Sequence, residues 1–117
     1  PVHLRHENYA RVRERLSRLR MVGGSLAERG RLDKGRFDGF SLSDFGSYCS
    51  AEGYAACWQA VIASAAPGAQ YCERIFMNDM PVPFPGVTID SALSDSLSAL
   101  DRSIIYRIRT GVIGGPC

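Results

Sequence analysis

The sequence of 117 residues predicts an α/β fold with a single domain. Two observations lead to this prediction. Segments with helical and with extended apolar periodicity alternate in the order helix, strand, strand, helix, strand, helix, strand. The later strands are separated by helix-sized segments, which parallel neighbours require, so we expect a mainly parallel sheet with crossover helices.

The first helix is predicted from about Glu7 to Arg18. Its apolar residues recur at spacings of three and four, which places them on one helix face: Tyr9, Val12, Leu16 and Leu19. The sequence LRMVGG, residues 19–24, then predicts a short strand that ends at a glycine pair, where the backbone can turn freely. After a charged stretch, FDGFSL at residues 37–42 predicts the second strand.

The helix within residues 50–68 is the clearest element of the pattern. Its apolar residues follow the 3.6-residue period, Ser50 is a good N-cap, and Pro67-Gly68 is expected to end it. The sequence AQYCERIF, residues 69–76, predicts the strand that follows.

The last third of the chain predicts a loop, a helix and a strand. Residues 80–86 are proline-rich and predict a loop. The helix is expected from about Asp90, its cap, to Leu100, and the β-branched stretch 103–113 predicts the last strand. Residues 114–117, GGPC, are expected to form a flexible tail.

Charge is distributed unevenly along the chain. Residues 1–36 carry ten Arg or Lys against four Asp or Glu, a balance of +6, whereas residues 37–117 carry four against eight, a balance of −4. A solvated arginine-rich helix face explains the basic segment, and contact with an anionic membrane surface is the alternative. Nucleic-acid binding is not expected, because interleaved aromatics and glycine loops are missing.

Hydropathy and cysteine usage favour a cytoplasmic protein. No apolar run approaches the roughly 20 residues that span a bilayer, and the arginine-rich start lacks the apolar centre of a signal peptide. The four cysteines match neither a CxxC pair nor a zinc spacing, so we expect reduced thiols and no metal site: Cys49, Cys57, Cys72 and Cys117.

Four stretches, taken in order, carry a family resemblance: LRHENYARVRERLSRLRMVGGSL, FDGFSLSDF, AAPGAQYCERIFMN and LDRSIIYR. Together they resemble the S-adenosylmethionine:diacylglycerol 3-amino-3-carboxypropyltransferases of betaine-lipid synthesis. The resemblance implies the C-terminal half of a Rossmann-like class I transferase sheet, with S-adenosylmethionine as cofactor. It also implies lipid biosynthesis, with the 3-amino-3-carboxypropyl group passing to an alcohol such as diacylglycerol and methylthioadenosine leaving.

The chain departs from this family in one respect. The glycine-rich turn that follows the first strand of such a fold has no counterpart here, because Gly23-Gly24 comes too late and lacks a G-x-G-x-x-G pattern. We therefore interpret residues 1–117 as a single partial domain. We expect a partner chain or a preceding half that carries this turn.

The resemblance also suggests site residues on the turns after strands. Asp44 is expected to orient the cofactor or to accept the proton of the alcohol, with Ser43 and Tyr48 beside it; a plain turn cap is the alternative. Gly24, Ser25 and Leu26 are expected to contact adenine. Arg74, Asn78 and Arg102 are assigned to the acceptor side, and Tyr106 completes the catalytic set with Asp44 and Tyr48.

Two other functions stay open on the sequence alone. An ordinary S-adenosylmethionine-dependent methyltransferase would share the sheet and the cofactor position, because a fold does not fix a reaction. A non-catalytic half-domain subunit that completes a partner chain is the other alternative, and the missing glycine-rich turn is its best support.

Overall fold

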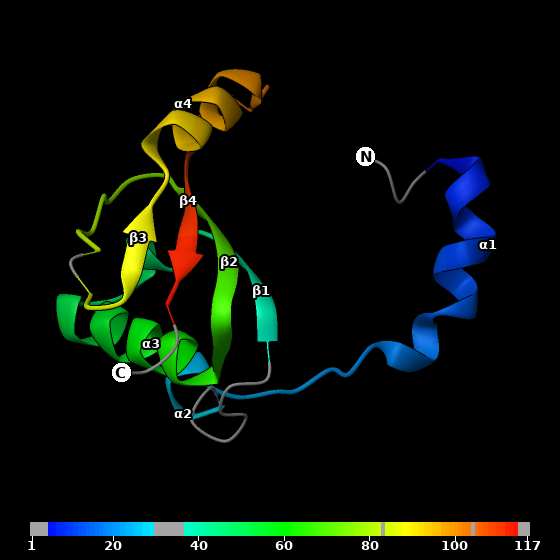
Figure 1. Cartoon of the computed structure of the whole chain (residues 1–117), viewed down its shortest axis with the longest axis horizontal. Helices are drawn as coiled ribbons and strands as arrows, with labels where there is room; N and C mark the ends of the chain where they lie inside the picture. Colours follow the sequence, from blue (N-terminus) through cyan, green and yellow to red (C-terminus); the bar gives the residue numbers. More distant parts are fainter. Residues whose placement is uncertain (1–4, 30–36, 83, 104, 115–117) are drawn as a thin grey trace.

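The computed structural model describes residues 5–29, 37–82, 84–103 and 105–114. Within them, four strands form one sheet in the order β1-β2-β4-β3 (Figure 1). The elements, in chain order, are α1 (His6–Glu14), the 3₁₀ turn η2 (Leu16–Arg18), α2 (Leu26–Arg29), β1 (Phe37–Leu42), the 3₁₀ turn η3 (Gly46–Tyr48), α3 (Ala51–Ser64), β2 (Ala65–Ile75), β3 (Val87–Ile89), α4 (Ser91–Leu100) and β4 (Arg107–Ile113).

The α/β class is confirmed, but the expectation of a mainly parallel sheet is wrong. Only β1 and β2, joined through α3, run parallel, while β4 lies antiparallel to both β2 and β3. The cause is the position of α4, which continues beyond the end of β3 instead of returning across the sheet (Figure 1). The chain therefore re-enters the sheet from the end at which it left, and β4 runs backwards. The three-residue β3 was not expected from the sequence.

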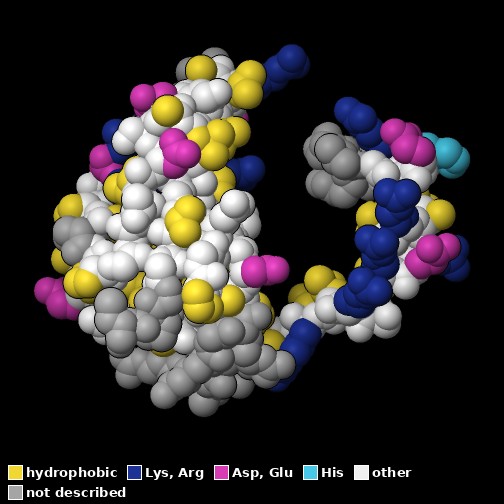
Figure 2. Space-filling model, viewed as in Figure 1, with side chains coloured by type: hydrophobic (Ala, Val, Ile, Leu, Met, Phe, Trp, Pro, Cys, Tyr) yellow, Lys and Arg dark blue, Asp and Glu magenta, His cyan; other side chains and the backbone are white. Residues whose placement is uncertain are grey.

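The amino-terminal segment differs from its prediction in two ways. The first helix ends at Glu14, and η2 continues it as a tighter turn. The strand predicted over residues 19–24 is wrong: these residues form no strand. A short strand needs a neighbour to satisfy its backbone groups, and Figure 1 shows this segment leading away from the sheet toward α1. Figure 2 shows Arg side chains gathered along α1, of which no residue is buried.

The helix α3 forms where it was predicted and carries one side of the core. Its N-cap is confirmed, since the Ser50 hydroxyl accepts a hydrogen bond from the Gly53 N–H at 3.2 Å. Helix α3 ends at Ser64, earlier than expected, and β2 starts at once. Pro67 and Gly68 thus fall inside β2, where the register with β1 shifts, because proline cannot donate to a regular ladder.

The core lies between α3 and one face of the sheet. Trp58 and Val61 of α3 are fully buried, and the Trp58 ring meets the Tyr71 ring edge-on with centroids 5.0 Å apart. Side chains of β2 alternate accordingly: Tyr71 is buried and Gln70 is exposed. Burying each large apolar side chain contributes about 1.5–3 kcal/mol. The opposite face of β2 is left without such cover in the described part of the chain.

Two serines of α4 take the place of a strand beside β4. The N–H of Thr110 donates to the Ser94 hydroxyl at 3.0 Å, and the N–H of Ile108 donates to the Ser98 hydroxyl at 2.9 Å. Four residues of a helix rise by about 6 Å, close to the roughly 6.8 Å of two strand residues, so the two spacings match. The predicted Asp90 cap of α4 is confirmed by its bond to the Leu93 N–H at 2.9 Å.

One edge of the sheet is open. Strand β1 pairs with β2 on one side, and no described strand lies on its other side. Leu42 is its single buried residue, and the Phe37 side chain is 45% exposed. An edge of this kind presents unpaired backbone groups to which a further strand can be added. Of the predicted tail, only Gly114 lies within the described residues, and its N–H bonds to the Gly86 carbonyl at 2.7 Å.

Candidate functional site

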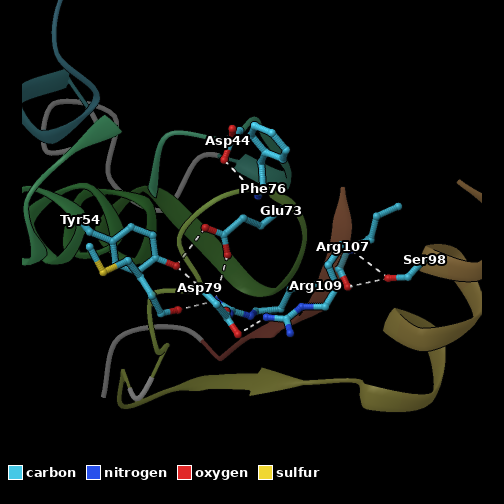
Figure 3. A network of polar contacts seen from close by, with 10 residues as sticks. Asp44, Tyr54, Glu73, Phe76, Asp79, Ser98, Arg107 and Arg109 are labelled. Carbon is cyan, nitrogen blue, oxygen red and sulfur yellow. Dashed lines mark hydrogen bonds and ion pairs between the residues drawn. The ribbon is translucent and has the colours of Figure 1, made fainter. Parts of the chain in front are cut away.

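The carboxyl ends of the parallel strands β1 and β2 lie at the same edge of the sheet, and Asp44 connects them. The Asp44 side chain, in a residue only 8% exposed, accepts at Oδ1 from the Ser47 hydroxyl at 2.6 Å and from the Phe76 N–H at 3.3 Å (Figure 3). Ser47 in turn accepts from the Met77 N–H at 3.1 Å. Asp44 therefore has a structural task, since it holds the end of β2 to the turn after β1, and its contacts in the described residues use Oδ1.

A hollow of about 300 Å³ opens beside this connection. It lies between the end of β2 and the segment that enters β4. The rings of Phe76 and Tyr106 meet edge-on in its wall, with centroids 5.9 Å apart, and the Arg74 guanidinium lies 5.9 Å from the Tyr106 centroid. Its lining consists of Ile75, Phe76, Met77, Asp79, Ile105, Tyr106 and Arg107. The structure thus brings Arg74 and Tyr106 into contact, and it joins them to Asp44 through Phe76.

A charged cluster extends from this hollow into the core (Figure 3). Arg109 Nη1 donates to Glu73 Oε2 at 3.2 Å, to the Tyr54 hydroxyl at 3.2 Å and to the Met80 carbonyl at 3.0 Å. The Tyr54 hydroxyl donates to Glu73 Oε1 at 2.9 Å. Asp79 bridges two guanidiniums, with one oxygen on Arg109 and the other on Arg107. The cluster links α3, β2 and β4 at the edge that carries the hollow.

Burial changes the acidity of this cluster. It raises the pKa of Glu73 above its ordinary value, although the Tyr54 hydrogen bond and the charge of Arg109 act in the opposite direction. Burial, with the neighbouring Glu73 charge, also raises the pKa of Tyr54. Burial is also the largest cause at Tyr71, deeper in the same core, where it raises the pKa to about 12. Tyr54 is therefore a hydrogen-bond donor at neutral pH, not a source of protons.

The remaining predicted site residues are exposed on the surface of the protein. Ser43 is exposed, and its carbonyl accepts from the Phe45 N–H at 2.6 Å. Tyr48, in η3, is 76% exposed. Asn78 is exposed and precedes Asp79 in the loop beside the hollow, whereas Arg102 is exposed in the turn after α4.

The structure does not bring the three predicted adenine contacts to Asp44. Gly24, Ser25 and Leu26 lead into α2, which packs against α3. Figure 1 shows α2 beside α3, toward the end of the sheet where β2 begins. The strand that was expected to deliver these residues to the carboxyl edge is not formed. The contacts of Asp44 with distant parts of the chain are therefore made at the end of β2 and not with residues 19–26.

Sequence reasoning missed the charged cluster: Tyr54, Glu73, Asp79, Arg107 and Arg109. One signal for it was present, because Glu73 alternates in phase with Tyr71 and Ile75, both buried, and so had to face the core. A charge at an inward strand position requires a partner. The position of that partner, on the antiparallel strand β4, followed from a pairing that the sequence did not reveal.

Among the described residues, no group of His, Cys, Asp or Glu side chains is arranged to hold a metal ion. The described helices are too short or too polar for any of them to cross a membrane. Comparison with protein-family models, curated proteins and solved structures found no match to this chain.

Proposed function

We propose that this chain is part of an S-adenosylmethionine-dependent transferase. The reaction moves the 3-amino-3-carboxypropyl group to the oxygen of an alcohol such as diacylglycerol. A carbon–sulfur bond of the sulfonium breaks, a carbon–oxygen bond forms, methylthioadenosine leaves, and a base takes the proton of the alcohol. The observation that carries the proposal is the position of Asp44 at the joint carboxyl end of β1 and β2, where α/β sheets bind ligands.

The sheet order supports a Rossmann-like half of a class I transferase domain. A parallel βαβ unit joined to antiparallel strands in one sheet occurs in many doubly wound folds. The open edge of β1 is where the missing strands of such a domain would continue the sheet. A partner chain or a preceding half would add these strands and the glycine-rich turn.

The described residues fit one end of the cofactor. Asp44 and the exposed Ser43 offer acceptors at the crevice, suited to the ammonium of the methionine part. Gly24, Ser25 and Leu26 do not lie at this edge, so the proposal assigns adenine to the part of the domain that carries the glycine-rich turn. Asp44 and Tyr106 are proposed to act on the acceptor, Tyr48 to line the crevice, and Arg74, Asn78 and Arg102 to bind the substrate.

A lipid acceptor would require contact with a membrane surface, and α1 together with η2 supplies residues for it. The apolar side chains of these two elements are exposed, Tyr9 of α1 to 63% and Leu16 of η2 to 56%. Arginines flank these residues along the segment: Arg5, Arg11, Arg13, Arg15, Arg18 and Arg20. Near an anionic surface each contributes about 1 kcal/mol to binding. We place the protein in the cytoplasm, peripheral to the inner face of the membrane.

The second candidate function is a non-catalytic half-domain that completes a partner. It is favoured by one observation, that Asp44 Oδ1 is engaged in holding Ser47 and Phe76. In this case the Asp44 carboxylate only stabilises the fold, and no residue of this chain contacts the cofactor.

Product analysis tests the proposal. The chain, with any chain that co-purifies, is incubated with S-adenosylmethionine and diacylglycerol vesicles, and the nucleoside product is identified by mass spectrometry. Methylthioadenosine supports transfer of the aminocarboxypropyl group. S-Adenosylhomocysteine instead identifies a methyltransferase, and absence of both products favours the non-catalytic subunit.

A further inference from the structure

The hollow beside β2 is lined by an anion and a cation side by side. Asp79 and Arg107 both line it, and one terminal nitrogen of Arg107 contacts Asp79. Phe76 and Tyr106 provide an apolar wall next to this pair. Its volume of about 300 Å³ lies at the lower end of the range in which proteins bind small molecules.

The charges of the cluster balance, and this limits what the hollow can bind. Glu73 is compensated by Arg109, and Asp79 by Arg107. A simple anion entering the hollow would therefore meet Asp79, and a simple cation would meet Arg107. A molecule that carries both charges a short distance apart satisfies the two groups together.

The exposed half of the cluster has capacity to bind such a molecule. Arg107 uses one nitrogen in the described contacts, while a guanidinium carries five N–H donors and a carboxylate accepts about four hydrogen bonds. The side chains of Arg107 and Asp79 are 57% and 48% exposed, so water screens their pair and an incoming ligand can open it at little cost. Asp79 keeps its second oxygen on Arg109, which is only 11% exposed and stays fixed.

We propose that this hollow binds an α-amino carboxylate, with the carboxylate on Arg107, the ammonium on Asp79 and the aliphatic side chain against Phe76. The inference rests on the proposed function for the source of that group, which is the amino-carboxylate end of the transferred product, because the ammonium of the donor is assigned to Asp44. The site itself follows from the geometry of the hollow. It gives Arg107 and Asp79 a binding role that sequence reasoning assigned to Arg74, Asn78 and Arg102.

The test is a titration of the 117-residue chain followed by NMR, with L-methionine as the probe. Propionate and ethylamine, each with a single charge, are the controls. We expect saturable shifts at Phe76, Tyr106 and Arg107 with L-methionine, and binding at least about tenfold weaker for either control, a difference of about 1.4 kcal/mol. Equal response to all three probes, or no saturable shift, overturns the proposal.

Two variants locate the binding groups. Arg107→Gln and Asp79→Asn are each expected to weaken L-methionine binding by about tenfold or more, whereas Asp95→Asn, exposed on α4, leaves it unchanged. If Asp79→Asn fails to fold, because Arg109 loses a partner, Arg107→Gln alone decides, since its side chain is mostly on the surface. Unchanged binding in Arg107→Gln overturns the site.

A parallel titration with S-adenosylmethionine separates this inference from the proposed function. Binding of L-methionine without binding of S-adenosylmethionine supports the hollow and counts against the transferase. Binding of S-adenosylmethionine without any response to L-methionine supports the transferase and overturns the hollow as a site for an α-amino carboxylate.

Discussion

Glu73 and Arg109 form a buried ion pair across β2 and β4, with Arg109 Nη1 3.2 Å from Glu73 Oε2 and side chains 2% and 11% exposed. Neither could be placed there alone, because an unpaired buried charge is far more costly than a pair. The pair fixes the register of two antiparallel strands at the edge that carries Asp44 and the hollow. The contribution of the Glu73–Arg109 pair to the free energy of unfolding can be measured with single substitutions.

Loss of Arg109 should strongly destabilise the protein. Arg109→Met leaves Glu73 buried without its cation, and we expect the free energy of unfolding to fall by about 3–5 kcal/mol. Arg107→Met is the matched control on the same strand, and its half-exposed pair with Asp79 predicts a loss below about 1 kcal/mol. Urea denaturation measures both. Equal losses in the two variants would contradict the assignment of Glu73–Arg109 as the buried pair.

Stability should depend on pH through Glu73. Burial raises the pKa of Glu73 in the folded protein above its ordinary 4.5, so between these two values the folded state binds the extra proton. The contribution of Glu73 to the free energy of unfolding is therefore greatest below pH 4.5. It is lost as the pH rises through the pKa of Glu73 in the folded protein. The difference in unfolding free energy between wild type and Glu73→Gln, measured from about pH 4 to about pH 8, should change in favour of the variant as pH rises. A constant difference would contradict the raised pKa.

Removing the hydroxyl should change the stability of the protein differently at Tyr71 and at Tyr54. The Tyr71 hydroxyl is buried and has no hydrogen-bond partner among the described residues, so Tyr71→Phe should be neutral or raise stability by about 1 kcal/mol. Tyr54→Phe removes a donor from Glu73 and should cost about 1–3 kcal/mol. Thermal unfolding of the two variants provides the comparison, and a larger loss for Tyr71→Phe would show that its hydroxyl has a partner.

The serine pair of α4 should matter more than its neighbours. Ser94→Ala leaves the Thr110 N–H without its acceptor, and Ser98→Ala does the same to Ile108, so each should cost about 1–3 kcal/mol. Ser96→Ala, exposed on the same helix, should be neutral or slightly stabilising, because alanine is the better helix former. Hydrogen exchange at Thr110 and Ile108 should accelerate only in the first two variants; equal protection in all three would exclude the ladder.

Local patterns predicted most of the elements. Ser50 and Asp90 were identifiable as caps because capping depends on residues three positions apart. The β2 strand was identifiable from its alternation, and Phe37–Leu42 from its apolar residues. Each of these signals is short-range, so no knowledge of neighbouring strands was needed.

What the sequence did not reveal depends on pairing between distant segments. The direction of β4, the existence of β3 and the failure of residues 19–24 to form a strand all depend on which backbone lies alongside. The same holds for the site. Asp44 could be singled out by its position after a strand, but its bond to Phe76, 32 residues away, and the Asp79–Arg107 contact required the assembled sheet.

Calorimetric titration with S-adenosylmethionine tests whether Asp44 binds the cofactor. The protein is used as purified, with its assembly state established by native mass spectrometry, and is compared with Asp44→Asn, which keeps the acceptor for Ser47 and Phe76 but loses the charge. We expect saturable binding that Asp44→Asn weakens by about tenfold or more, while thermal stability is largely kept. Absence of binding, or equal binding by the variant, would contradict a cofactor role for this carboxylate and leave it as the tie between β1 and β2.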